Sequence, residues 1–221
     1  MPTYFVTGTD TEVGKTVVTA GLLRAFARAG RGAVGMKPVA AGMEDGRYAD
    51  VERHRAAGNR AAPDHLANPY AFEPPIAPHI AAALAGVEIR IETIVAAHRE
   101  LAGHADVVVV EGAGGFMIPL NDRETSADLV SALGIPVILV VGMRLGCLNH
   151  ALLTQEAVRA RGLAFAGWVA NVIAPGMPHL DRNVETLVER LQAPLLGVIP
   201  YQPGIGPDEV ADRLDLSRLS A

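Results

Sequence analysis

The sequence of 221 residues has little of several features that mark particular protein classes. Its single cysteine, Cys147, excludes an intrachain disulfide, as is usual in a reducing cytosol. It has no cluster of basic residues, and its net charge of −5 argues against nucleic-acid binding. The apolar runs 107–110 and 137–141 are far shorter than the roughly 20 residues of a membrane-spanning helix. We therefore expect a cytoplasmic protein that binds neither nucleic acid nor membranes.

Apolar runs of strand length recur along the chain, at residues 3–7, 33–38, 106–110, 136–141, 166–172 and 195–199. They are continuously apolar, which is typical of parallel strands covered on both faces. Helical patterns lie between most of them, at residues 16–29, 80–85, 91–101, 126–133, 148–161 and 180–191. This alternation predicts an α/β fold with a mainly parallel sheet and helices on both faces. No linker or internal repeat interrupts it, so we expect one domain over residues 1–221.

The most informative segment is residues 8–16, GTDTEVGKT, between the first apolar run and a helical pattern. A strand, a glycine-bounded loop ending in Gly-Lys-Thr and a helix form a phosphate-binding loop, in which Lys15 reaches the outer phosphates and Thr16 binds Mg²⁺. Backbone N–H groups at the helix N-terminus bind the anion. Five residues separate Gly8 from Gly14, one more than usual, so the loop is a variant. The segment predicts a nucleoside-triphosphate site.

Charged residues also end two other predicted strands. Glu111 follows the valine run 107–110, and a carboxylate at this end of a parallel strand suits metal binding beside phosphates. Lys37 ends the second strand, where Pro38 holds it in an extended conformation. Together with Lys15 it would neutralise an anionic intermediate as well as the triphosphate. From spacing alone, a solvated strand-end lysine explains Lys37 equally well.

Other candidates rest on weaker patterns. Asp50 begins a predicted helix, where aspartate is favoured. Asn171 lies near the end of the strand that contains Trp168, where it would either hydrogen-bond a base or cap a turn. Four histidines show no metal-ligand spacing, and we interpret them as core or surface residues: His54, His65, His98 and His104.

Five segments together resemble the dethiobiotin synthetase family of the phosphate-loop NTPase superfamily. They are residues 8–16 (GTDTEVGKT), 37–40 (KPVA), 110–115 (VEGAGG), 145–150 (LGCLNH) and 167–171 (GWVAN). Their order and approximate spacing match the family from residue 3 to about residue 202. The resemblance implies a cytosolic homodimer with a seven-stranded sheet. It also implies a ligase of biotin biosynthesis that converts 7,8-diaminononanoate, CO₂ and MgATP into dethiobiotin, ADP and phosphate.

The resemblance also implies roles for individual residues. The Mg²⁺ shell would be Thr16, Asp50 and Glu111. The ATP-binding residues would be Glu12, Val13, Gly14, Lys15, Thr16, Val17, Asp50, Glu111, Gly112, Ala113, Gly114, Asn171, Pro200, Tyr201 and Gln202. The catalytic groups around a carbamate would be Lys37, Lys15 and Thr11. The substrate would be held by Lys37 and Ala41 and, across the dimer interface, by Gly146, Cys147, Leu148 and Asn149. Ala41 stands where the family usually has a hydroxyl residue, so that side-chain hydrogen bond is absent.

Two other classes share part of this pattern. Nucleotide-switch ATPases of the partitioning class have a similar sheet and loop, but they carry a second lysine in the loop where this chain has Asp10. Membrane-bound switches end in a basic amphipathic helix, whereas residues 208–221 are acidic. Amide-forming ligases of the cobyrinate type need a glutamine-hydrolysing domain with a nucleophilic cysteine, and the chain is too short for one. The switch ATPase is therefore the main alternative to the synthetase.

Overall fold

A computed structural model describes residues 2–43 and 45–219. Within these residues, a six-stranded sheet has the order β2-β5-β1-β6-β7-β8, and a separate two-stranded sheet pairs β3 with β4. All of these strand pairs are parallel. The strands are β1 (Thr3–Gly8), β2 (Ala33–Met36), β3 (Val39–Ala41), β4 (Tyr70–Phe72), β5 (Val107–Glu111), β6 (Val137–Met143), β7 (Phe165–Val172) and β8 (Leu195–Ile199).

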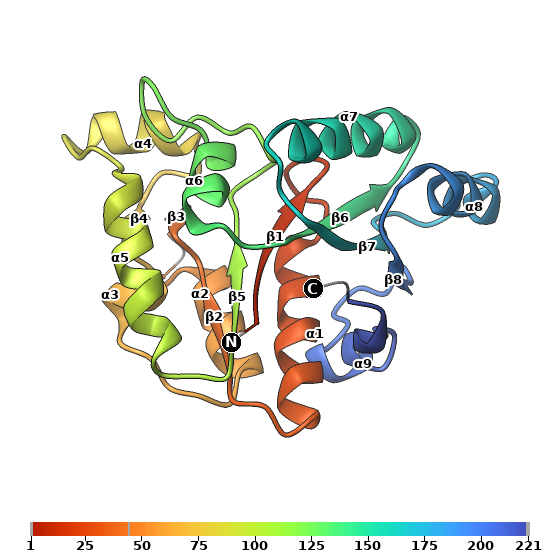
Figure 1. Cartoon of the computed structure of the whole chain (residues 1–221), viewed down its shortest axis with the longest axis horizontal. Helices are drawn as coiled ribbons and strands as arrows, with labels where there is room; N and C mark the ends of the chain where they lie inside the picture. Colours follow the sequence, from red (N-terminus) through yellow and green to blue (C-terminus); the bar gives the residue numbers. More distant parts are fainter. Residues whose placement is uncertain (1, 44, 220–221) are drawn as a thin grey trace.

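Helices flank the main sheet on both faces (Figure 1). Helix α1 packs against α2 and α9, whereas α5 packs against α6 and α7 against α8. The helices are α1 (Lys15–Arg28), α2 (Ala49–Ala57), α3 (Asp64–Ala67), α4 (Pro78–Leu84), α5 (Ile91–Ala102), α6 (Ser126–Leu133), α7 (Cys147–Ala160), α8 (Leu180–Arg190), α9 (Pro207–Ala211) and the 3₁₀ helix η1 (Leu216–Arg218). Over the two described ranges, no helix has the length and apolar character to cross a membrane.

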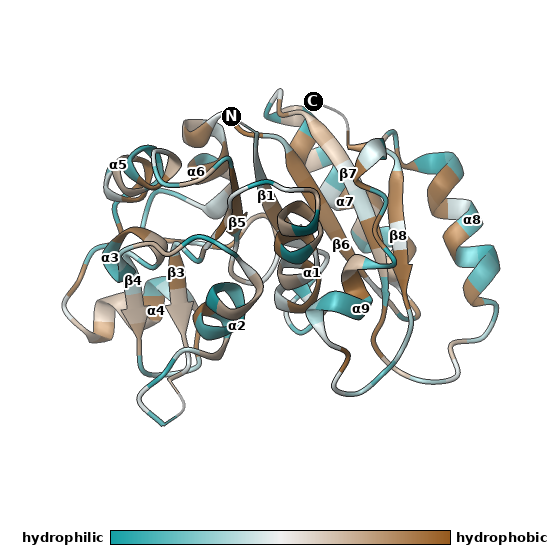
Figure 2. Cartoon of the chain, turned by 90° about the horizontal axis from the view of Figure 1, so that it is seen from below, coloured by the Kyte–Doolittle hydropathy of each residue, from teal (hydrophilic) through white to brown (hydrophobic). Residues whose placement is uncertain are grey.

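The central strands are buried on both faces, which explains their continuous apolar runs. On β5, Val107 and Val109 pack in the core beneath α1, whereas Val108 and Val110 pack in the core beneath α5 and α6. Successive side chains of a strand point to opposite faces, so each face needs its own apolar set. Figure 2 shows mainly hydrophobic strands β6 and β8, whereas α2 is largely hydrophilic. The predicted α/β class with helices on both faces is confirmed.

The structure differs from the predictions in the segment after β2. The predicted strand 33–38 ends at Met36, because the Lys37 N–H group donates to the Ala67 carbonyl oxygen (2.7 Å) and Pro38 has no N–H group to donate. Strand β3 begins at Val39 and pairs with β4 instead of joining the main sheet. The main sheet therefore has six strands in the described residues, not the seven that the family resemblance implied.

The strand order brings three predicted site segments to one edge of the sheet. Strand β5 lies between β1 and β2, and residues 108–111 of β5 pair with residues 3–6 of β1. All three strands are parallel, so their carboxyl ends meet at the same edge. Lys37 follows β2, Glu111 ends β5, and the loop before α1 follows β1. Ligands of open α/β sheets bind at this edge.

Candidate active site

The loop between β1 and α1 has the backbone geometry of an anion site. Gly14 has a φ of +86°, and a Cβ there would lie 2.1 Å from Asn171 Nδ2, so only glycine fits. Asn171, on β7, donates from Nδ2 to the Val13 carbonyl oxygen (2.8 Å) and braces the loop. No side chain in the described part of the chain caps the N-terminus of α1. Its N–H groups therefore stay available to an anion, which the helix dipole also favours.

Two carboxylates and one lysine form a compact cluster beside this loop. Lys37 Nζ lies 2.6 Å from Glu111 Oε1 and 2.8 Å from Asp50 Oδ2. The Thr16 hydroxyl lies 2.8 Å from Asp50 Oδ1 and 2.9 Å from Glu111 Oε1. Lys37 and Glu111 are 5% and 1% exposed, so the charges are held away from water. A hydroxyl has one proton, and Thr16 therefore donates to one carboxylate at a time.

The neighbours of each group set its protonation. Burial opposes the charge of Lys37, but Glu111 and Asp50 outweigh it and raise the pKa of Lys37. Burial also opposes ionisation of Glu111, but Lys37 and His54 outweigh it and lower its pKa below the usual range. Lys15 is 7% exposed, and the nearby carboxylates Glu111, Asp50 and Asp10 support its charge only weakly. Its burial and the nearby charge of Lys37 lower the pKa of Lys15 to about 8.

The oxygen atoms of Thr16, Asp50 and Glu111 fit a Mg²⁺ ion. Mg²⁺ prefers oxygen ligands and usually takes one or two carboxylates together with water and phosphate oxygens. No cluster of three or more His, Cys, Asp or Glu side chains in residues 2–43 and 45–219 is suited to hold a metal by itself. The arrangement therefore suits a metal that arrives with a phosphate ligand rather than a closed protein cage.

A cavity of about 700 Å³ opens above these groups. Its walls are the phosphate loop, the strand ends and residues 75–78, which lead into α4. The predicted site residues that line it are Thr11, Glu12, Gly14, Lys15, Thr16, Val17, Lys37, Ala41, Asp50, Glu111, Ala113 and Gly114. The fold thus gathers the residues predicted for phosphate, metal and carbamate into one volume.

Other predicted ATP-binding residues lie outside this cavity. Val13 is buried in the core beneath α1, and Gly112 contributes its carbonyl oxygen, 3.4 Å from Lys37 Nζ. Pro200 and Gln202 line a separate hollow of about 230 Å³ beside α9, and Tyr201 next to them is exposed. The predicted adenine-binding segment is therefore set apart from the phosphate loop in this chain.

The predicted substrate-binding turn begins α7 and also lies outside the cavity. Gly146 has a φ of +95° at the start of the helix, Cys147 is buried, and Leu148 packs on the core beneath α7 and α8. Arg144 of the same turn forms an ion pair with Asp10 of the phosphate loop. The turn is thus tied to the loop, although residues 146–149 do not line the cavity of their own chain.

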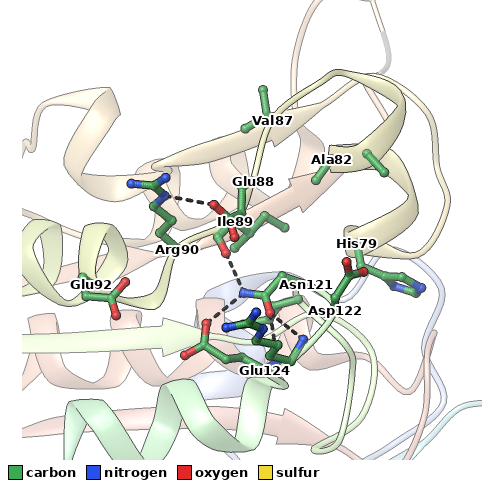
Figure 3. Close-up of a pocket in the computed structure, with 13 residues that line it drawn as sticks. His79, Ala82, Val87, Glu88, Ile89, Arg90, Glu92, Asn121, Asp122 and Glu124 are labelled. Atoms are coloured by element: carbon green, nitrogen blue, oxygen red, sulfur yellow. Dashed lines mark hydrogen bonds and ion pairs between the residues drawn. The ribbon is translucent and has the colours of Figure 1, made fainter.

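A larger cavity, of about 880 Å³, lies between α4, the start of α5 and residues 120–124 (Figure 3). The polar and charged side chains at its opening pair with residues close to them. Arg90 Nε lies 3.2 Å from Glu88 Oε2, and Asn121 Nδ2 donates to the Ile89 carbonyl oxygen and to Glu124. No lysine lines it, and none of the predicted site residues does. The buried charges mark the smaller cavity, not this one, as the phosphate site.

The structure adds one residue to the site that sequence reasoning missed. His54 is 3% exposed, and its Nε2 lies 2.7 Å from Glu111 Oε2. It follows Asp50 by four residues on α2, so both side chains lie on one face of the helix. This spacing is the available signal in the sequence, but without metal-ligand spacing the sequence predicts only a core or surface histidine there.

Comparisons with known proteins agree with this geometry. A family model described as an AAA domain matches residues 2–209. The chain is 57% identical over 216 residues to the ATP-dependent dethiobiotin synthetase BioD of Nitrosospira multiformis, covering 98% of this chain and 96% of that protein. It is 54% identical over 217 residues to the enzyme of the same name from Aromatoleum aromaticum, covering 96% of each chain. This chain belongs to the dethiobiotin synthetase family. The predicted resemblance is confirmed.

Solved structures with low sequence identity extend the comparison to the fold of the family. A chain of the MinC:MinD cell division protein complex of Aquifex aeolicus aligns with a TM-score of 0.61 at 18% identity, covering 96% of this chain and 86% of that chain. The signal recognition particle receptor FtsY of Elizabethkingia anophelis aligns with a TM-score of 0.53 at 16% identity, covering 96% and 64%. At these identities the likeness concerns the fold alone.

Proposed function

We propose that this chain is an ATP-dependent dethiobiotin synthetase, a ligase of biotin biosynthesis. The proposal rests mainly on one observation. In this chain, which belongs to the family, Lys15 and the buried Lys37–Glu111 pair line the same cavity at one edge of the sheet. The substrates are 7,8-diaminononanoate, CO₂ and ATP. The products are dethiobiotin, ADP and phosphate.

The phosphates of ATP bind at the N-terminus of α1. The free N–H groups of the loop and the Lys15 ammonium group neutralise the outer phosphates. Thr16, Asp50 and Glu111 would hold Mg²⁺, supported by their mutual distances of 2.8 and 2.9 Å through the Thr16 hydroxyl. The ion held there would supply neutralisation of the charge that develops during phosphoryl transfer. The base would extend toward Asn171 and residues 200–202.

The reaction begins with a neutral amine of the diamine. Its nitrogen attacks the carbon of CO₂ and loses a proton to solvent, which leaves a carbamate anion. A carbamate oxygen then attacks the γ-phosphorus of ATP and ADP departs. The second amine, also neutral, attacks the carbonyl carbon and loses a proton to solvent, which closes the five-membered urea ring and expels phosphate. Each step needs positioning and charge neutralisation more than covalent help from the protein.

Lys37 acts in this scheme as a fixed cation. Its raised pKa keeps it protonated at neutral pH, so it does not serve as a base. It lines the cavity together with Lys15 and Thr11, where two positive charges and a hydroxyl group can surround the carbamate. The Ala41 side chain offers no hydrogen bond at the same wall, so the substrate would use the backbone there.

We further propose a homodimer in which residues 146–149 of one subunit close the active site of the other. Leu145 is 98% exposed, so it does not pack beneath its own helix. An apolar side chain this exposed at the ligand-binding edge of the sheet is best explained by a covering partner.

Mixing two inactive variants, Lys37→Ala and Asn149→Ala, tests this arrangement. A mixed dimer contains one site with intact Lys37 and an intact partner turn, so we expect partial recovery of activity after subunit exchange. Proven exchange without recovery would contradict a shared site. A single chain that is active as a monomer would contradict it as well.

The proposed function is tested by following ADP and dethiobiotin together, with each substrate omitted in turn. We expect ADP release to depend on both the diamine and CO₂, with one ADP formed for each dethiobiotin. A nucleotide-switch ATPase would instead release ADP without the diamine. That result, or turnover without dethiobiotin, would reject the synthetase.

A further inference from the structure

His54 lies beside the carboxylate of Glu111 in the buried part of the site. Its Nε2 lies 2.7 Å from Glu111 Oε2, and both side chains are almost fully buried. The strand beneath it makes room for the ring. A Cβ on Gly35 would lie 2.7 Å from His54 Cβ and 2.9 Å from Cγ, closer than carbon atoms can approach. Glycine in β2 therefore lets α2 press His54 against the sheet.

The surroundings of the ring decide which nitrogen carries the proton. His54 Nδ1 is buried and has no hydrogen-bond partner within residues 2–43 and 45–219. A proton on Nδ1 would leave a buried donor unsatisfied, which is costly. A proton on Nε2 is donated to Glu111 Oε2 instead. Of the two neutral tautomers, the geometry therefore favours the one with its proton on Nε2.

This hydrogen bond divides the two oxygen atoms of Glu111 between two tasks. Oε2 accepts from His54, whereas Oε1 is contacted by Lys37 Nζ at 2.6 Å and by the Thr16 hydroxyl at 2.9 Å. The terminal torsion of a glutamate has a broad minimum and does not fix the carboxylate plane. A buried donor at Oε2 does fix it, so Oε1 stays directed toward Thr16.

We propose that His54 is a positioning residue, which holds the Glu111 carboxylate in the orientation that binds the metal of the nucleotide complex. The inference rests on the proposed role of Glu111 in the MgATP site. Under this proposal, helix α2 supplies two residues to the site. Asp50 contributes an oxygen from its first turn, and His54 orients the second carboxylate from the next turn. Such outer partners of metal ligands are typically worth about 10- to 100-fold in metal affinity or activity.

The test compares His54→Leu with His54→Gln, and the probe is Mn²⁺ bound to the ADP complex in the absence of diamine. Electron paramagnetic resonance reports the Mn²⁺ dissociation constant without catalysis. We expect His54→Leu to weaken Mn²⁺ binding about tenfold or more, because Oε2 loses its donor. His54→Gln keeps an amide donor and should stay within about threefold of wild type. The half-saturating Mg²⁺ concentration for turnover should follow the same order.

Controls separate positioning from packing. His98 is a buried histidine on α5, so His98→Leu provides a matched loss of a buried ring elsewhere and should leave Mn²⁺ affinity unchanged. Unchanged Mn²⁺ affinity in folded His54→Leu would overturn the proposal. Equal weakening in His54→Leu and His54→Gln would assign His54 to packing and would overturn it too.

Glu111→Gln distinguishes failure of this inference from failure of the metal site itself. If Glu111→Gln leaves Mn²⁺ affinity unchanged, the proposed metal site is wrong and His54 loses its role with it. If Glu111→Gln weakens Mn²⁺ binding and His54→Leu does not, the metal site stands and the positioning role alone is rejected. We expect both variants to weaken it, with Glu111→Gln the more severe.

Discussion

The cavity beside the phosphate loop and the larger cavity beside α4 differ in how they hold charge. In the first, the side chains of Lys37 and Glu111 are 6% and 1% exposed and lie 2.6 Å apart. In the second, the side chains of Arg90 and Glu88 are 68% and 64% exposed and lie 3.2 Å apart. An exposed pair contributes only about 0–1 kcal/mol, whereas a buried charge is costly unless it is closely paired. Convergent buried charge, rather than volume, is therefore the reason we propose the first cavity as the active site.

The largest effect should come from Lys15→Ala in the smaller cavity. This change removes the cation that reaches the transferred phosphoryl group, and we expect kcat to fall by about 10³-fold or more. Circular dichroism should show an intact fold, because among the described residues the Lys15 side chain donates only to the Asp10 carbonyl oxygen of its own loop. A kcat within tenfold of wild type would contradict the assignment of Lys15.

The metal requirement should change next most strongly. Asp50→Asn and Glu111→Gln each remove one charged oxygen of the proposed metal shell. The half-saturating Mg²⁺ concentration should therefore rise by at least about tenfold, because even the loss of a residue that only orients a metal ligand typically costs that much. Glu111→Gln also removes one of the two carboxylates that pair with buried Lys37, so the free energy of unfolding should fall, by less than the roughly 3–5 kcal/mol of a fully unpaired buried charge because Asp50 stays in place. Titration of Mg²⁺ and of urea measures the two effects. Unchanged Mg²⁺ titrations in both variants would exclude these residues from the metal site.

The pH dependence of nucleotide binding should report Lys15 rather than Lys37. The pKa of Lys15 is about 8, so its charge is present below pH 8 and is lost as the pH rises through that value. The pKa of Lys37 is raised, so its charge persists through the same range. We expect ATP affinity in the absence of diamine to weaken above about pH 8. The same measurement on Lys15→Ala should give a flat profile, and an unchanged profile would show that another group titrates.

The smallest effect should come from the larger cavity. Arg90→Gln breaks an exposed pair, so the free energy of unfolding should change by no more than about 1 kcal/mol. Dethiobiotin formation should stay within twofold of wild type, because Arg90 does not line the phosphate cavity. If folded Arg90→Gln lost as much activity as Lys15→Ala, the proposal that only the smaller cavity is the active site would be wrong.

Most of the fold and the phosphate loop could be predicted because their signals are local. The apolar runs fixed the position of each main-sheet strand to within about two residues at most ends, as is normal for such patterns. The loop from Gly8 to Thr16 carries its own motif, and Glu111 stands at the end of a valine run. In each case the residues that determine the feature are neighbours in sequence.

Features that depend on contacts between distant segments could not be predicted in the same way. His54 contacts Glu111 across 57 positions, and Asn171 braces the Val13 carbonyl group across 158. Strands β3 and β4 have three residues each, too few for a periodic pattern. These arrangements depend on how distant segments pack together, and the residue pattern of one segment alone does not predict that packing.

The most direct test of the account is a crystal structure of the protein with ADP, Mg²⁺ and 7,8-diaminononanoate. We predict the phosphates of ADP at the N-terminus of α1, Mg²⁺ beside Thr16, Asp50 and Glu111, and the amines of the substrate near Lys37. Nucleotide bound in the cavity between α4 and residues 120–124, or Mg²⁺ held by other side chains, would contradict it.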